Sequence, residues 1–146
     1  LFRRYILDAL MGAKADIVLA VDALSEGMNI EDAERKVDVV SCSRRFTGDY
    51  LLEIDPAWVE KISNKIPAAD IHGEWIGLVR TNPRGSDLIR AEIAAMEEEG
   101  SLRNASLLDL LSRLLKAGHK IGVLYVAGNW LDVDDAFDLA EARNFT

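Results

Sequence analysis

Four aspartates gather in residues 127–138, near the end of the chain. The first part of this segment has the alternation of a short strand, which places Trp130, Asp132 and Asp134 on one side and the intervening apolar residues on the other. Two carboxylates separated by one residue suit a hard divalent cation such as Mg²⁺, which prefers oxygen ligands and usually keeps several waters. The spacing therefore predicts a magnesium site at Asp132 and Asp134.

The other two aspartates fit a simpler role. Asp135, followed three residues later by Asp138, resembles an N-cap arrangement for a helix over residues 136–143. All four aspartates could in the same way be solvated residues that favour a strand-to-helix turn. The segment by itself leaves both the metal site and the purely structural role open.

Further charged side chains lie where predicted strands start or end. Glu74 precedes a strand and would face the same cleft if Gly77 lets a ligand approach the backbone, although Gly77 could instead form a bulge or a tight helix contact. Arg44 and Arg45 follow a strand end, a common place for ligand groups in α/β sheets. One of them, or Arg80, could bind an oxyanion such as a phosphonate bidentately, and each could also be an ordinary surface charge.

The aromatic, histidine and cysteine residues give weaker indications. Trp130 could stack on a base or contact a quaternary ammonium group, or it could pack against the sheet. His119 follows a helix-ending glycine and is expected to satisfy carbonyl groups there, whereas His72 is expected on a loop surface. Cys42 is expected to have no histidine nearby and to be a small buried residue, and Tyr125 is expected to serve packing.

The elements that must position these residues alternate along the chain. Residues 16–22 form a nearly continuous apolar run, the pattern of a strand buried on both faces. The alternation predicts one α/β domain over residues 1–146, with three αβα layers and a mainly parallel, partly mixed sheet. The other predicted strands cover 37–43, 74–80 and 121–126, and the predicted helices cover 1–11, 56–62, 85–99, 107–117 and 136–143. Ser106 and Asp109 should cap the start of the helix over 107–117, and Gly118 should end it.

Composition narrows the class of protein. The chain has 146 residues, of which 49% are hydrophobic and 29% charged, as in a globular domain with a real core. No apolar run approaches the roughly 18 residues of a membrane span, and a single cysteine fits a reducing, cytoplasmic compartment. The net charge of −8, without a basic cluster, argues against binding to nucleic acid or to a membrane surface.

Several segments, in order, resemble one family. This family is the nucleotidyltransferase domain, related to sugar-phosphate nucleotidyltransferases, that is often fused behind phosphoenolpyruvate mutase in phosphonate biosynthesis. The segments are Val37-Asp-Val-Val-Ser-Cys-Ser43, Gly73-Glu-Trp-Ile-Gly77, Leu107-Leu-Asp-Leu-Leu111, Ala117-Gly-His119 and Gly128-Asn-Trp-Leu-Asp-Val133.

The resemblance implies a Mg²⁺-dependent transfer of CMP from CTP to a phosphonate such as 2-aminoethylphosphonate. It implies that Asp132 is the catalytic metal ligand, with Asp134 as a possible second ligand. The second family aspartate and the phosphate-binding loop would precede residue 1, so the chain looks like the acceptor-side part of a nucleotide-diphospho-sugar transferase-like fold. Relatives often carry histidine where Asn129 stands, so the acceptor could differ.

Two other possibilities stay open from the sequence. Without a phosphate loop, the chain could be a non-catalytic binding or assembly module. It could also expose an apolar surface where a missing half would dock, and form a homodimer.

Overall fold

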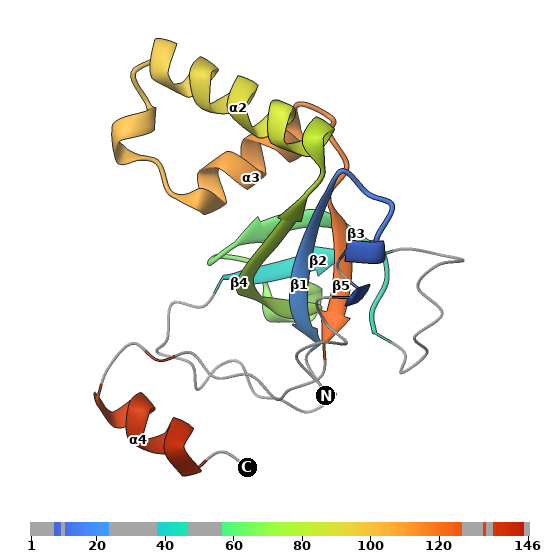
Figure 1. The fold of residues 1–146 in the computed structure, drawn as a ribbon, viewed down its shortest axis with the longest axis vertical. Helices are drawn as coiled ribbons and strands as arrows, with labels where there is room; N and C mark the ends of the chain where they lie inside the picture. Colours follow the sequence, from blue (N-terminus) through green and yellow to red (C-terminus); the bar gives the residue numbers. More distant parts are fainter. Residues whose placement is uncertain are drawn as a thin grey trace.

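The central feature of the computed structural model is a closed barrel of five strands, β1, β4, β2, β3 and β5 in order around it (Figure 1). The structure describes residues 8–9, 11–23, 38–46, 57–126, 133 and 136–144. Strands β1 and β5 run parallel, and the other neighbouring strands of the barrel run antiparallel. The strands are β1 Ile17–Ala23, β2 Val39–Cys42, β3 Ala57–Ser63, β4 Gly73–Thr81 and β5 Gly122–Val126.

The predicted three-layer αβα fold with a mainly parallel sheet is therefore wrong. The main cause is the segment 56–62, which was predicted to be a helix and in fact contains most of strand β3. β3 pairs with β2 on one side and with β5 on the other, so it closes a sheet that a helix at this position would have left open. The predicted strands at β1, β2, β4 and β5 are confirmed.

Strand β1 is buried on both faces, as its apolar run predicted. Ile17, Leu19 and Val21 point into the barrel and belong to the main core. On the outer face, Val18 packs with Leu124 of β5 against alanines that lie between residues 9 and 15. Residues 8–9 and 11–12 are helical, in agreement with the predicted helix at the start of the chain.

Two helices pack at one end of the barrel and extend its core (Figure 1). They are α2, Pro83–Glu98, and α3, Leu107–Lys116, with the short helix η3, Leu102–Asn104, between them. Met96, Leu111 and Leu114 are almost fully buried within the same core as the barrel interior. The predicted helices over 85–99 and 107–117 are thus confirmed with small changes at their ends.

Capping interactions fix where these helices begin. The Asn82 side chain accepts a hydrogen bond from the Gly85 N–H at 2.8 Å at the start of α2. At the start of α3, Ser106 and Asp109 form the predicted capping box, and Gly118 follows the helix with φ +87°. A left-handed glycine is the usual end of a helix because other residues enter that conformation at a cost.

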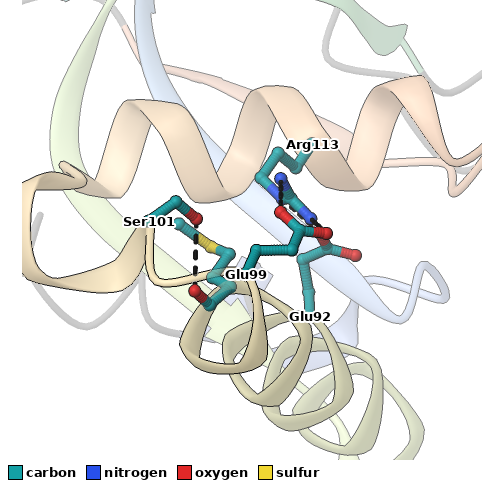
Figure 2. A network of polar contacts seen from close by, with 5 residues as sticks. Glu92, Glu99, Ser101 and Arg113 are labelled. Atoms are coloured by element: carbon teal, nitrogen blue, oxygen red, sulfur yellow. Dashed lines mark hydrogen bonds and ion pairs between the residues drawn. The ribbon is translucent and has the colours of Figure 1, made fainter.

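An arginine on α3 joins the two helices (Figure 2). The Arg113 guanidinium donates to the carboxylate of Glu92 and to both carboxylate oxygens of Glu99, at 2.8 and 3.0 Å from the latter. Nearby, the Ser101 hydroxyl donates to the Met96 carbonyl oxygen at 3.2 Å after the end of α2. These contacts tie the end of α2 and the following turn to α3.

Strand β4 contains a bulge at Gly77. The β1–β4 register passes from Leu19 opposite Val79 to Val21 opposite Trp75, so β4 carries extra residues at this point. Gly77 has φ +80°, and a Cβ atom there would meet nothing within 4 Å. The bulge considered from the sequence is therefore confirmed, and no helix of the described residues makes the alternative tight contact at Gly77.

Beyond the barrel, the described chain includes the helix α4, Ala136–Asn144, where a helix was predicted. A short helix, η2, Ala68–Asp70, precedes β4. Within the part of the chain that the structure describes, no helix is long and apolar enough to cross a membrane.

Candidate functional site

Several chain segments meet at the barrel end where β1 and β5 finish. Because these two strands are parallel, they end side by side, with Asp22 opposite Val126. Strand β4 begins at the same place, with Glu74 opposite both Asp22 of β1 and Val39 of β2. The described part of β5 therefore ends, at Val126, beside Asp22 and close to the start of β4.

Two carboxylates lie in cross-strand register at this end. Their neighbours Val21 and Trp75 belong to the barrel interior, so by strand alternation Asp22 and Glu74 lie on the outer face. Both residues are half-buried. The backbone oxygen of Asp38 accepts the Trp75 N–H at 2.8 Å, and burial raises the pKa of the Asp38 carboxyl. A concentration of acidic groups thus surrounds the start of β4.

Just before β4 begins, on the side of β4 that faces β2, His72 contacts Cys42. The Cys42 backbone N–H donates to His72 Nδ1 at 2.9 Å. The backbone N–H of His72 donates to the Val40 carbonyl oxygen at 2.9 Å. Burial lowers the pKa of the His72 ring, and so does the nearby positive charge of Arg45. His72 does lie in a loop, as expected, but it is half-buried, and the expectation of no histidine near Cys42 is wrong.

Cys42 and Tyr125 form the inner wall of this region. The Tyr125 hydroxyl donates to the Arg44 carbonyl oxygen at 2.6 Å, and its ring lies 5.7 Å from that of Phe46. Burial raises the pKa of Tyr125 and raises that of the Cys42 thiol to about 11, so both stay protonated at neutral pH. The predicted burial of Cys42 and the packing role of Tyr125 are confirmed.

Two of the arginines considered for substrate binding hold the backbone of the chain. The Arg45 guanidinium donates to the carbonyl oxygens of Ala69 and Ile71, at 2.6 and 3.2 Å. Arg80 donates to the Ala15 carbonyl oxygen at 2.7 Å and so ties β4 to the chain before β1. Arg44 is half-buried beside Tyr125, next to the candidate site.

The remaining predicted site residues lie outside the described residues. These are Trp130, Asp132 and Asp134, together with the expected cap Asp135. Their roles stay predictions, and only their point of departure from the barrel, after Val126, is placed.

Sequence reasoning missed Asp22. A signal was present, because Asp22 comes directly after the apolar run of β1, and ligand groups often lie at the carboxyl ends of parallel strands. Among the described residues, no group of three histidine, cysteine, aspartate or glutamate side chains could hold a metal ion. A full set of carboxylate ligands at this end would therefore have to include residues outside the described ones.

Neither a scan against protein-family models nor a search of curated proteins finds a match to this chain.

Proposed function

We propose that this chain takes part in Mg²⁺-dependent nucleotidyl transfer, as the part that holds the metal ion and the acceptor. The proposed donor is CTP, the proposed acceptor is a phosphonate such as 2-aminoethylphosphonate, and pyrophosphate is released. The observation that carries the proposal is the meeting of Asp22, Glu74 and Val126, the last residue of β5, at one barrel end. The ordered family motifs add to it.

The donor groups at this end fit Mg²⁺. Asp22 is a carboxylate beside the end of β5, and Asp132 and Asp134 follow β5 within a few residues. Mg²⁺ prefers carboxylate oxygens and keeps several waters, so one or two carboxylates of the protein suffice to hold it. In this proposal Asp22 takes the place of the second aspartate that the resemblance puts before residue 1. When bound, Mg²⁺ would neutralise negative charge on the reacting phosphate.

Glu74 is proposed to bind the acceptor. It lies in register with Asp22, so an acceptor held by Glu74 would be next to the metal ligands. A carboxylate can accept charge-assisted hydrogen bonds from the ammonium group of an aminophosphonate. In nucleotidyl transfer the protein mainly positions the acceptor oxygen for in-line attack at phosphorus. Trp130 and Arg44 remain candidates for further contacts with the acceptor.

Magnesium binding by the chain tests the ligand assignment. Isothermal titration with Mg²⁺ should show binding that falls by about tenfold or more in Asp22→Asn and in Asp132→Asn, as expected for the loss of a metal ligand. Asp87→Asn is the matched control, because Asp87 is exposed on α2 and pairs with Arg90. Binding that stays within about threefold of the unchanged chain in both site variants would refute the assignment.

Pyrophosphate release tests the reaction itself. The complete gene product, supplied with CTP, Mg²⁺ and 2-aminoethylphosphonate, is compared with its Asp132→Ala variant. A variant activity within about threefold of the original would show that Asp132 does not hold the catalytic metal, since that loss should cost far more.

One observation favours a second candidate, a non-catalytic binding or assembly module. Arg45 and Arg80 donate to carbonyl groups of their own chain, and the net charge is −8, so the supply of positive charge for a triphosphate is small. Titration with CTP and Mg²⁺ distinguishes the nucleotidyltransferase from the non-catalytic module. Binding of 2-aminoethylphosphonate with Mg²⁺ but no turnover of CTP would favour the module.

A further inference from the structure

The contact between β2 and β4 is short and is completed by a side chain. The two strands pair through two residues of each strand, with Val40 opposite Gly73 at one end. Just beyond this pair, the backbone N–H of His72 donates to the Val40 carbonyl oxygen. The His72 ring accepts a hydrogen bond from the Cys42 backbone N–H at Nδ1. The imidazole thus occupies the place that a backbone carbonyl would have in a longer strand pairing. We call the two residue pairs between β2 and β4, together with the His72 ring, the β2–β4 seam.

The seam requires one protonation state of His72. A ring nitrogen accepts a hydrogen bond only when it carries no proton, so the ring must be neutral with its proton on Nε2. Turning the ring over would place a carbon atom opposite the Cys42 N–H and would leave that donor without an acceptor. A protonated ring has two donors, and its Nδ1–H would oppose the Cys42 N–H.

The surroundings of the ring fit the neutral form. Burial lowers the pKa of His72, and the positive charge of Arg45 lowers it further. Of the charged groups nearby, Glu60 on β3 and Asp70 on η2 act in the opposite direction, and the net shift is downward. The buried Cys42 thiol stays neutral, because burial raises its pKa to about 11.

We propose that His72 is an acid-sensitive latch of the barrel: uptake of a proton from solvent at Nδ1 breaks the hydrogen bond from the Cys42 amide and opens the β2–β4 seam. The same proton turns an acceptor into a donor that repels the amide, so the seam loses a contact and gains an unfavourable one. The latch is closed at neutral pH and opens as the pH falls. This inference does not depend on the proposed function.

Cys42 provides a built-in reporter of the seam. Cys42 is the single cysteine of the chain and is 1% exposed. The rate of its reaction with an aromatic disulfide reagent is measured in the folded chain and in the same chain unfolded in urea, at about pH 7.5 and about pH 5. The ratio of the two rates removes the direct effect of pH on the thiol. This ratio should rise by about tenfold at the lower pH, as the loss of one part-buried hydrogen bond implies.

Two glutamine variants separate the latch from general acid effects. In His72→Gln the side-chain oxygen can still accept the Cys42 N–H but cannot titrate, so the rate ratio should lose its pH dependence. The other histidine of the chain supplies the control, His119→Gln, which should behave like the unchanged protein. A flat ratio in the unchanged chain, or an equal rise in His72→Gln, would overturn the proposal.

Nitrogen NMR of the unchanged chain gives a second test that does not require a variant to fold. The His72 ring should carry its proton on Nε2 at neutral pH and titrate below the ordinary value of 6.5. A proton on Nδ1, or a titration above that value, would contradict the latch.

Discussion

Gly85→Ala tests the packing of α2 against β1 because two physical effects predict opposite signs. Gly85 lies in the first turn of α2, where the usual result of replacing glycine by alanine is a gain of up to about 1 kcal/mol. In this protein, however, an alanine Cβ would lie 2.1 Å from the Asp16 carbonyl oxygen, far inside normal contact distance. We therefore expect a loss of stability instead of a gain.

The size of the loss follows from what the displaced carbonyl holds. The Asp16 oxygen accepts the Asn82 N–H at 3.0 Å, and the Asn82 side chain bonds both the Asp16 carboxylate and the Gly85 N–H at 2.8 Å. Moving these groups apart costs about 1–3 kcal/mol for overpacking and about 1 kcal/mol for a weakened hydrogen bond. After the helix gain of about 1 kcal/mol is subtracted, the net destabilisation is about 2 kcal/mol.

Urea unfolding followed by circular dichroism measures this difference. Gly12→Ala is the matched control, since Gly12 is helical and exposed and an added Cβ would meet nothing within 4 Å. The control should leave the free energy of unfolding unchanged or slightly raised. If Gly85→Ala proves at least as stable as the original chain, the close approach of α2 to β1 is not as described.

Two further predictions concern the α2–α3 layer. Hydrogen bonds from Arg113 hold the pKa of the Glu99 carboxyl below its ordinary value of 4.5, so the pair stabilises the fold above that pH and its contribution is lost as the pH falls through the folded-state pKa. Arg113→Met should lower the melting temperature at neutral pH and flatten its fall in acid, while the exposed Arg103→Met should change neither. Leu114→Ala should lower the free energy of unfolding by about 3 kcal/mol, because the side chain of Leu114 is fully buried. Leu107 is 49% exposed, so Leu107→Ala should lower the free energy of unfolding by less than about 0.5 kcal/mol. Similar losses for the two leucines in denaturant unfolding would contradict the described orientation of α3.

Elements with strong local signals were predictable from the sequence. The apolar run of β1 and the capping box at Ser106 correspond to the structure because each depends on neighbouring residues. Strand β3 was missed because Trp58, Val59 and Ile62 have the spacing of a helix face, one and four residues apart. Its strand conformation depends on pairing with β2 and β5, which no local pattern reveals.

The candidate site was predictable only in part, for a related reason. Glu74 was named from its residue type and its place near a strand start, and it does lie at this barrel end, whereas the role of Asp132 stays a prediction. The contact between Cys42 and His72 joins residues that are 30 positions apart and exists only because β2 lies beside β4. The expected fold placed β1 in an open parallel sheet, so it did not bring the end of β1 against the start of β4, where Asp22 lies opposite Glu74.

The parallel pairing of β1 with β5 has a consequence for how the molecule is made. Val18 pairs with Gly122, so the first described strand meets the last one across most of the chain. During synthesis β1 leaves the ribosome long before its partner, and the barrel cannot close until β5 has followed. Contacts between distant parts of a chain slow folding because the intervening loop must close first. Until β5 is synthesised, the β1 edge that pairs with β5 therefore stays unpaired. Nascent chains halted before β5 are for this reason the form of this protein most in need of a chaperone.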